Sequence, residues 1–198
     1  MAGQIRRGSG DAIAAALWSS DLRGFTKLSD HVAGEDIIAI LDRVFDAQAR
    51  AIADHGGEIL KFIGDGLLAI FPLAAFEGAA AAATNAMAAA HEALAAVRAI
   101  EHEALGSESL EMVVALHYGT VIYGNIGAAD RLDFTVIGPS VNLVSRIEAV
   151  AKSLDLPLVV SDEFARAHGG ALQSLGLHKL RGLDQTRELF VPAADDRS

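Results

Sequence analysis

The amino-acid sequence predicts an α+β fold in which helices pack on one face of a sheet. Strand and helix patterns are mixed along the chain, at least two strand pairs have the pattern of antiparallel hairpins, and no internal repeat or clear interdomain linker divides the sequence. With 198 residues, of which 52% are hydrophobic and 21% charged, the chain suits one compact domain with a sizeable core. We expect this domain over residues 12–192, after a flexible N-terminal segment at 1–11 and before a tail at 193–198.

The first third of the chain alternates strand and helix patterns. A short apolar run over 12–19 indicates a buried strand. Apolar residues at helical spacing predict a helix over 34–52, which a pair of glycines ends. Two apolar runs, 58–63 and 67–71, flank Gly64-Asp65-Gly66, and this arrangement predicts a β-hairpin.

The rest of the chain continues the mixture. An alanine-rich stretch predicts a long helix over 75–105, and two strands are expected at 110–118 and 120–126. Pro139 suits the first turn of a helix over 141–154. The remaining predicted elements are strands at 133–137, 156–160, 172–180 and 188–191 and a short helix at 162–168.

Composition excludes several classes of function. The formal net charge of −10, with no basic stripe, argues against a duplex nucleic-acid binder, although metal ions could join an acidic site to a nucleotide. The chain has no cysteine, which excludes disulfides, thiolate zinc sites and cysteine nucleophiles. The longest apolar candidate, 74–100, carries charged residues and is not expected to span a membrane. We expect a cytoplasmic chain, which could still belong to a larger protein with a regulatory domain elsewhere.

Two aspartates stand beside glycines at strand ends. Asp21 follows the first predicted strand, and Asp65 occupies the tip of the hairpin. Carboxylates in such places can hold hard cations, and a neighbouring pair could bridge two Mg²⁺ ions about 4 Å apart for displacement at phosphorus. The alternative for each aspartate alone is an ordinary turn residue.

Three stretches in order resemble class III nucleotidyl cyclases. They are DLRGFT at 21–26, KFIGDGLLAIF at 61–71 and DFTVIGPSVNLVSR at 133–146. The resemblance spans roughly residues 12–191 and implies a ferredoxin-like βαββαβ sheet core. The activity that it implies is an adenylate cyclase, which converts ATP to cyclic AMP and pyrophosphate. Ser19 departs from the family, which usually has phenylalanine there.

The resemblance assigns the cation ligands. Asp21 and Asp65 match the metal-binding aspartates, and the backbone carbonyl of Leu22 matches a further contact with the metal. The implied cofactors are two divalent cations, Mg²⁺ or Mn²⁺, one activating the ribose 3′-hydroxyl and one holding the triphosphate. The same motifs place three more residues at the substrate, namely Phe25, Thr26 and Gly64.

Further residues match the family's transition-state and phosphate positions. Asn142 and Arg146 match the pair that positions the ribose and stabilises charge on the α-phosphate, and their spacing of four places them on one helix face. Without the motif, Arg146 would be interpreted as a solvated helix residue. Arg131 and Arg181 match basic positions near the β- and γ-phosphates, with ordinary surface charge as the alternative.

Two residues match the positions that read the purine. The Lys61 ammonium can donate to N1 of adenine, and the Thr135 hydroxyl can accept from its 6-amino group. In the family, lysine here accompanies adenylate cyclases and glutamate accompanies guanylate cyclases. Threonine marks a subset, some members of which resemble bicarbonate-responsive enzymes. The alternatives are a guanylate or mixed-specificity cyclase, and a catalytically silent module for dimerisation or nucleotide sensing.

The family resemblance also implies the assembly. In such enzymes the two aspartates come from one protomer, and the lysine, base-reading residue, asparagine and arginine come from the other. This chain carries both sets, so we expect a homodimer with two equivalent sites at its interface.

Overall fold

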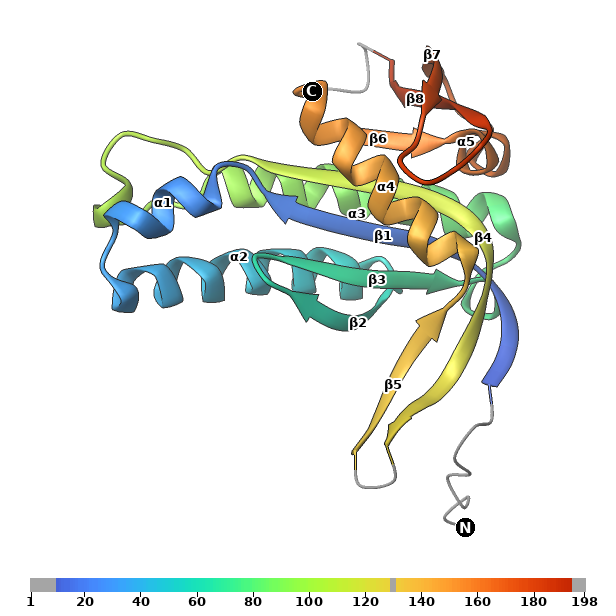
Figure 1. The fold of residues 1–198 in the computed structure, drawn as a ribbon, viewed down its shortest axis with the longest axis horizontal. Helices are drawn as coiled ribbons and strands as arrows, with labels where there is room; N and C mark the ends of the chain where they lie inside the picture. The colour runs from blue at the N-terminus through green and yellow to red at the C-terminus, as the bar shows by residue number, and fades with distance from the viewer. Residues whose placement is uncertain (1–9, 129–130, 194–198) are drawn as a thin grey trace.

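The computed structural model describes residues 10–128 and 131–193, and for 125–128 and 131–134 it describes the backbone alone. One eight-stranded sheet runs through the molecule, with helices on both sides (Figure 1). The strands are β1 (Gly10–Leu22), β2 (Glu58–Ile63), β3 (Gly66–Pro72), β4 (Met112–Ala128), β5 (Arg131–Ile137), β6 (Leu158–Ser161), β7 (Leu172–Lys179) and β8 (Thr186–Pro192). The helices are α1 (Phe25–His31), α2 (Gly34–Asp54), α3 (Ala79–Arg98), α4 (Pro139–Ser153) and α5 (Asp162–His168), with 3₁₀ turns η1 (Leu73–Ala75) and η2 (Glu103–Leu105).

The first half of the sheet forms the expected ferredoxin-like core. β1, α2, β2, β3, α3 and β4 follow one another along the chain, and their strands lie in the order β2-β3-β1-β4. All three strand pairs in this core are antiparallel. The predicted α+β class is therefore confirmed, and β1 lies at the centre, where its end meets the β2–β3 turn.

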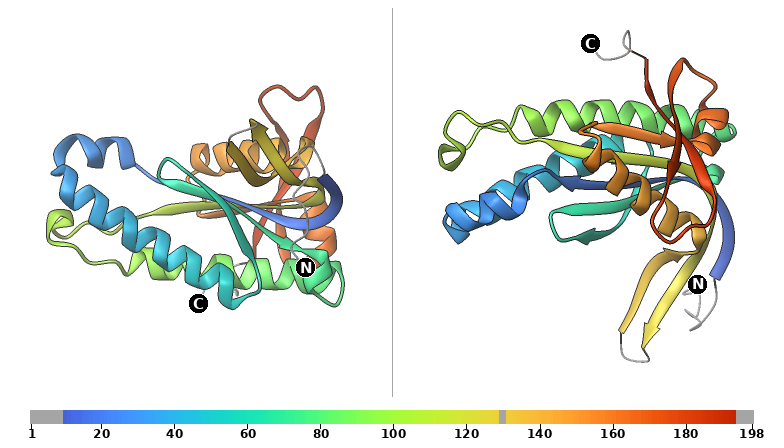
Figure 2. Two further views of the ribbon diagram at one scale, coloured as in Figure 1. Left: turned by 90° about the horizontal axis from the view of Figure 1, so that it is seen from below. Right: turned by 45° about the horizontal axis from the view of Figure 1, so that its top comes forward.

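The sheet buries both of its faces: α2, α3 and α5 pack on one face, as predicted, and α4 also covers the other. Ala16 and Trp18 of β1 belong to a core with α2, α3 and α5, whereas their neighbours Ala15 and Leu17 belong to a second core with α4. Successive strand residues face opposite sides, so these two sets identify two faces. Figure 2 shows the sheet between α4 and the pair α2 and α3. Strands that are buried on both faces appear in the sequence as apolar runs without alternation, and these runs were not interpreted as a sign of a second buried face.

Several element boundaries differ from the sequence-based prediction. The alanine-rich helix is shorter than 75–105, because α3 begins only after Gly78 (φ 104°) and the chain turns after Arg98 to bury Leu105. The strands expected at 110–118 and 120–126 are one strand, β4. β1 begins at Gly10, two residues before the expected domain start, and the short helix α1 had not been predicted.

Gly119 lies within continuous β4 and serves a close approach between elements. A Cβ atom at this position would lie 2.5 Å from Ser140 Oγ and 2.8 Å from His117 Nε2. The glycine therefore lets the start of α4 pack directly on β4.

Among the described residues, no helix combines the length and the apolar character needed to traverse a bilayer.

Candidate active site

The two aspartates singled out in the sequence meet in the structure. Asp21 is the second-last residue of β1, and Asp65 lies in the turn between β2 and β3. The turn is held against β1 so closely that a Cβ atom at Gly66 would lie 1.8 Å from the carbonyl oxygen of Ser20. A hydrogen bond joins the carboxyl groups of Asp21 and Asp65. A glycine thus permits the contact that places two acidic side chains together.

The environment of the acidic pair opposes ionisation of Asp65. Burial raises the pKa of Asp65 to about 6, and its hydrogen bond with Asp21 and the negative charge of Asp21 act in the same direction. A backbone hydrogen bond and the positive charge of Lys152 oppose the increase in this pKa. Two carboxylates in contact repel each other unless a proton or a cation lies between them.

A lysine side chain supplies a positive charge beside the acidic pair. Lys152 Nζ on α4 lies 2.5 Å from Asp21 Oδ2, and the lysine side chain is 36% exposed. The sequence analysis did not identify this residue. The sequence feature that could have identified Lys152 is its position four residues after Glu148, on the helix that also carries the predicted site residues.

The acidic pair fits a hard divalent cation. Both side chains supply oxygen ligands, and Leu22 buries its side chain at the end of β1, which leaves only its main chain for such a contact. The described residues contain no group of three or more histidine, aspartate or glutamate side chains arranged around a metal position. A cation here would therefore complete its coordination with main-chain, water or substrate oxygens, as Mg²⁺ usually does.

The residues that flank the aspartates differ in exposure. Gly24 (φ 67°) turns the chain into α1, where the half-buried Phe25 packs against the core and Thr26 is exposed. Gly64 (φ 61°) begins the turn that carries Asp65. The two motifs thus border the acidic pair, with Thr26 facing solvent.

Ser19, the departure from the family pattern, has a partner in the structure. Its side chain is almost fully buried, and its hydroxyl donates to Glu148 Oε2 on α4 at 2.6 Å. The small polar residue thus connects β1 to α4 where a larger ring would be expected.

The predicted transition-state residues lie on α4. Asn142 is exposed and Arg146 is half-buried. A Cβ atom at Gly182 would lie 3.5 Å from Arg146 Nη2, so the loop that carries Arg181 is close to the Arg146 guanidinium. Arg131 begins β5, and its side chain lies outside the described part of the structure.

The predicted base-reading residues lie on β2 and β5, two strands that contact each other. Lys61 is exposed on β2. Thr135 Oγ1 on β5 is buried and has no hydrogen-bond partner in the described part of the chain. Nearby, the Tyr123 hydroxyl donates to Glu58 Oε1 at 2.7 Å and ties β4 to β2.

Among the described residues, no hydrogen bond or ion pair connects the acidic pair to these predicted substrate residues on β2, β5 and α4. In the described part of the chain, the two aspartates interact with each other and with Lys152. We call Asp21 and Asp65 the acidic half of the predicted site, and the predicted substrate residues on β2, β5 and α4 its substrate half.

Exposed apolar side chains accompany the substrate half. Phe62 and Ile63 on β2 are both 54% exposed, and Ile122 on β4 and Ile137 on β5 are 45% and 47% exposed. We call these four residues the apolar edge. It follows the strands that carry Lys61 and Thr135, and the β4–β5 hairpin projects from the body of the molecule (Figures 1 and 2).

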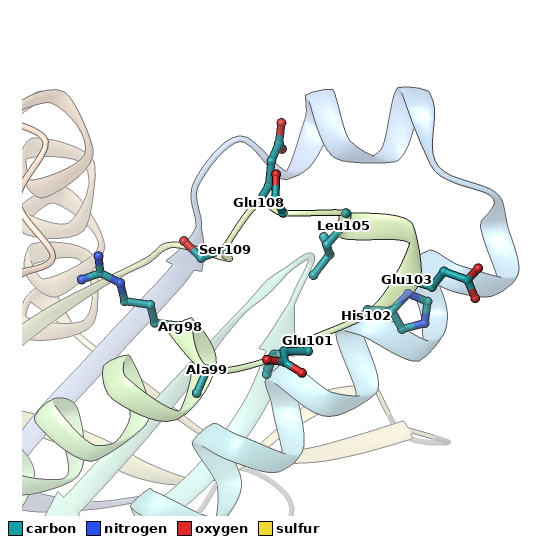
Figure 3. Close-up of a pocket in the computed structure, with 11 residues that line it drawn as sticks. Arg98, Ala99, Glu101, His102, Glu103, Leu105, Glu108 and Ser109 are labelled. Carbon is teal, nitrogen blue, oxygen red and sulfur yellow. The ribbon is translucent and has the colours of Figure 1, made fainter.

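Two surface hollows lie away from these residues. One, of about 490 Å³, is formed by the loop between Arg98 and Ser109 (Figure 3), and a second, of about 570 Å³, includes Asp36 and Arg43. The charged side chains of Arg98, Glu103 and Glu108 point away from one another in Figure 3. None of the predicted site residues lines either hollow, so we do not place the chemistry there.

Comparison with known proteins identifies relatives of this chain. The family model described as adenylate and guanylate cyclase catalytic domain matches residues 12–182. An adenylate cyclase from Anabaena cylindrica is 30% identical over 149 residues, which are 74% of this chain and 29% of that protein. Adenylate cyclase 1 from Rhizobium meliloti is 31% identical over 144 residues, or 72% of this chain and 21% of that protein. The chain therefore spans less than a third of the length of these relatives.

Solved structures of both substrate types have the same fold. The guanylyl cyclase Cya2 has a TM-score of 0.79 and 29% identity, with 91% of this chain and 92% of that chain covered. The adenylyl cyclase CyaB from P. aeruginosa has a TM-score of 0.81 and 25% identity, with 92% of this chain and 94% of that chain covered.

Proposed function

Because the chain belongs to the adenylate and guanylate cyclase catalytic domain family, we propose that it is an adenylate cyclase that converts ATP to 3′,5′-cyclic AMP and pyrophosphate. The observation that carries this proposal is the contact between Asp21 and Asp65, held together by the close approach of the hairpin turn to β1. A silent module would have no need to hold two repelling carboxylates in one place.

The cations of this proposal are two divalent ions, Mg²⁺ or Mn²⁺. Asp21 and Asp65 would hold them, with the Leu22 main chain as a further oxygen ligand. When bound, such ions neutralise phosphate charge and favour loss of the proton from the ribose 3′-hydroxyl.

The chain's own residues position the substrate for in-line displacement. The 3′-oxygen forms a bond to the α-phosphorus, the bond from that phosphorus to the β-phosphate bridge breaks, and pyrophosphate leaves with the electron pair. Asn142 orients the ribose, and the Arg146 guanidinium stabilises charge on the α-phosphate. No side chain acts as a nucleophile.

Other residues bind the remaining phosphates. Arg181, whose loop lies beside Arg146, and Arg131 attract the β- and γ-phosphates. The segment at Phe25 and Thr26 and the turn at Gly64 border the triphosphate, because they adjoin the two aspartates.

A homodimer completes each site. Among the described residues of one chain, no polar contact joins the acidic half to the substrate half, and the apolar edge supplies surface for a second copy. A twofold pair would set the aspartates of one chain against Asn142 and Arg146 of the other, twice. A regulatory domain outside this chain is consistent with the greater length of its relatives. Because the substrate is ATP, we place the reaction in the cytoplasm.

The base preference depends on Lys61 and Thr135. An unpartnered buried hydroxyl at Thr135 supports a contact with the 6-amino group of adenine, and Lys61 would donate to N1. The second candidate is a guanylate or mixed-specificity cyclase, which the similarity to the guanylyl cyclase Cya2 favours.

One assay tests the reaction, base choice, metal need and assembly together. Purified protein is incubated with ATP or GTP, with Mg²⁺ or Mn²⁺, over a range of protein concentrations. We expect cyclic AMP to exceed cyclic GMP and activity per protomer to rise with concentration. Absence of both products at every concentration would refute the proposed reaction, and a larger yield of cyclic GMP would establish the second candidate.

A further inference from the structure

Three polar contacts in series join the end of β1, and Arg23 just after it, to α4 and the turn that follows α4. Ser19 bonds to Glu148 at 2.6 Å, Asp21 to Lys152 at 2.5 Å, and Arg23 to Asp155. On the strand side the residues are two apart and therefore share a face. On the helix side, Glu148 and Lys152 are four apart and share one face of α4, whereas Asp155 (φ 59°) lies in the turn after the helix. We call this arrangement the polar ladder.

The middle rung differs from the outer two because it uses a predicted cation ligand. The charge of Lys152 acts on three carboxylates, namely those of Asp21, Asp65 and Glu148. Among the described residues it is the cation that interacts with all three. The ammonium thus lies among three carboxylates, where a divalent cation would also be attracted.

We propose that Lys152 is a built-in competitor of the divalent cation: its ammonium holds Asp21 in the metal-free protein and releases that carboxylate when the cation binds. The inference rests on the proposed function, since it takes Asp21 and Asp65 as the cation site. An ammonium 2.5 Å from Asp21 Oδ2 repels a second positive charge at the same carboxylate. One of the two cations must therefore withdraw.

The Lys152 side chain is flexible and exposed enough to leave this contact. Its ammonium is a compact charge on a flexible four-carbon chain, and about a third of the side chain is already exposed, so it can move into solvent. The outer rungs do not depend on this contact. Ser19 with Glu148 continues to hold α4 against β1 after Lys152 leaves, and Arg23 with Asp155 continues to join the segments that follow these two elements.

In the metal-free state, the Lys152 ammonium would stabilise the acidic pair. Without a counter-charge, the Asp21 and Asp65 carboxylates repel each other at the turn that Gly66 holds against β1. The ammonium keeps the pair assembled before the cation arrives, and it reduces the affinity for that cation in exchange.

A binding measurement without nucleotide tests the inference apart from catalysis. Free Mn²⁺ is followed by electron paramagnetic resonance while the purified full chain is titrated with Mn²⁺ alone. Lys152→Met removes the charge and keeps the length of the side chain, so we expect the dissociation constant to fall by roughly three- to tenfold. Lys152→Arg keeps the charge and should bind Mn²⁺ within about twofold of the wild type.

A matched control removes the same charge elsewhere. Lys179 is exposed on β7, four strands from β1 in the sheet, and Lys179→Met should leave Mn²⁺ binding within about twofold of the wild type. Equal or weaker Mn²⁺ binding by Lys152→Met, relative to Lys179→Met, would overturn the inference. Circular dichroism verifies folding, and Lys152→Gln replaces the methionine variant if that protein does not fold.

The failure of this inference can be told from failure of the proposed function. Asp65→Ala should abolish the Mn²⁺ binding measured in the wild type, and retained binding would show that the cation site itself was wrongly placed. If the wild type forms cyclic nucleotide and Asp65→Ala loses Mn²⁺ binding, but Lys152→Met binds no more tightly, then only the competition by Lys152 is refuted.

Discussion

The acidic half of the predicted site and its substrate half differ in how the chain prepares them. Asp21 and Asp65 are half-buried, in contact, and compensated by Lys152 within one chain. Lys61 and Asn142 are exposed, and no polar contact of the described residues joins them to the acidic pair. The fold has to keep repelling charges close together, whereas exposed side chains can become ordered when a partner binds. The comparison shows that the contacts of the acidic half form within one chain, which is why the proposed function assigns completion of the substrate half to a second copy.

Removal of one acidic side chain breaks the preassembled half and has the largest expected effect. Asp65→Ala should lower cyclic AMP formation at saturating Mn²⁺ by roughly a thousandfold or more, because cation-assisted charge neutralisation is lost. The fold should persist, since the variant also removes a repulsion. Asp46→Ala, at an exposed position on α2, is the matched control and should retain activity. Normal turnover by Asp65→Ala would contradict the role of this residue.

Mixing two inactive variants tests whether the halves come from different chains. Asp65→Ala lacks the acidic half and Asn142→Ala lacks the substrate half, so a heterodimer keeps one intact site. A purified heterodimer has one intact site of two, so we expect about half of wild-type activity per dimer, whereas the unfractionated equal mixture should show about a quarter. The measurement is cyclic AMP formation by tagged, purified heterodimers. No recovery in proven heterodimers would argue against shared sites.

A change of base specificity sharpens the description of the substrate half. Lys61→Glu replaces a donor with an acceptor, which suits guanine better than adenine. The ratio of kcat/KM for ATP to that for GTP should fall by roughly tenfold or more. Lys179→Glu makes the same charge change on β7 and should keep the wild-type ratio. An unaltered ratio in Lys61→Glu would remove Lys61 from the base-reading site.

The smallest expected effect concerns the support beneath α4. His117 on β4 is 3% exposed, and its Nδ1 is hydrogen-bonded to Ser161 Oγ at 2.8 Å. Burial lowers the pKa of His117 to about 4, an effect that Glu163 opposes and Arg187 reinforces. The unfolded histidine takes up its proton near pH 6.5, so stability is present above that pH and is lost as pH falls toward about 4.

Urea unfolding at pH 7 and pH 5 measures this dependence. The wild type should lose on the order of 2 kcal/mol of unfolding free energy over this interval through His117. His117→Gln cannot titrate, so its loss should be smaller by that amount. An identical loss in both proteins would assign the pH dependence to other groups.

Much of the fold was predicted from local sequence patterns, and each incorrect prediction has a specific cause. The β2–β3 hairpin and the start of α4 were correctly predicted, because Gly64-Asp65-Gly66 and Pro139 act through their own turns. The glycine at position 119 suggested a break in β4, whereas it permits close packing of Ser140. Alanine propensity overextended α3, since burial of Leu105 outweighs it.

The sequence indicated residues of the candidate site but not the contacts between them. The sequence indicated Asp21 and Asp65 through strand ends and glycines, and the structure places them in contact. It did not indicate Lys152, because a lysine on a helix is usually solvated. It also did not indicate the apolar edge, because exposure of Phe62 depends on which strand forms the edge of the sheet.

The sequence by itself determined the class of the fold, the turn that carries Asp65, and the set of residue types that the proposed chemistry needs. These depend on preferences that act within about one turn of the chain. Only the tertiary structure decided which face α4 covers and which charges meet, as in the Ser19–Glu148 contact between residues 129 positions apart. Such contacts depend on strand order and register, which are set by burial of the whole sheet and are not encoded in any short segment.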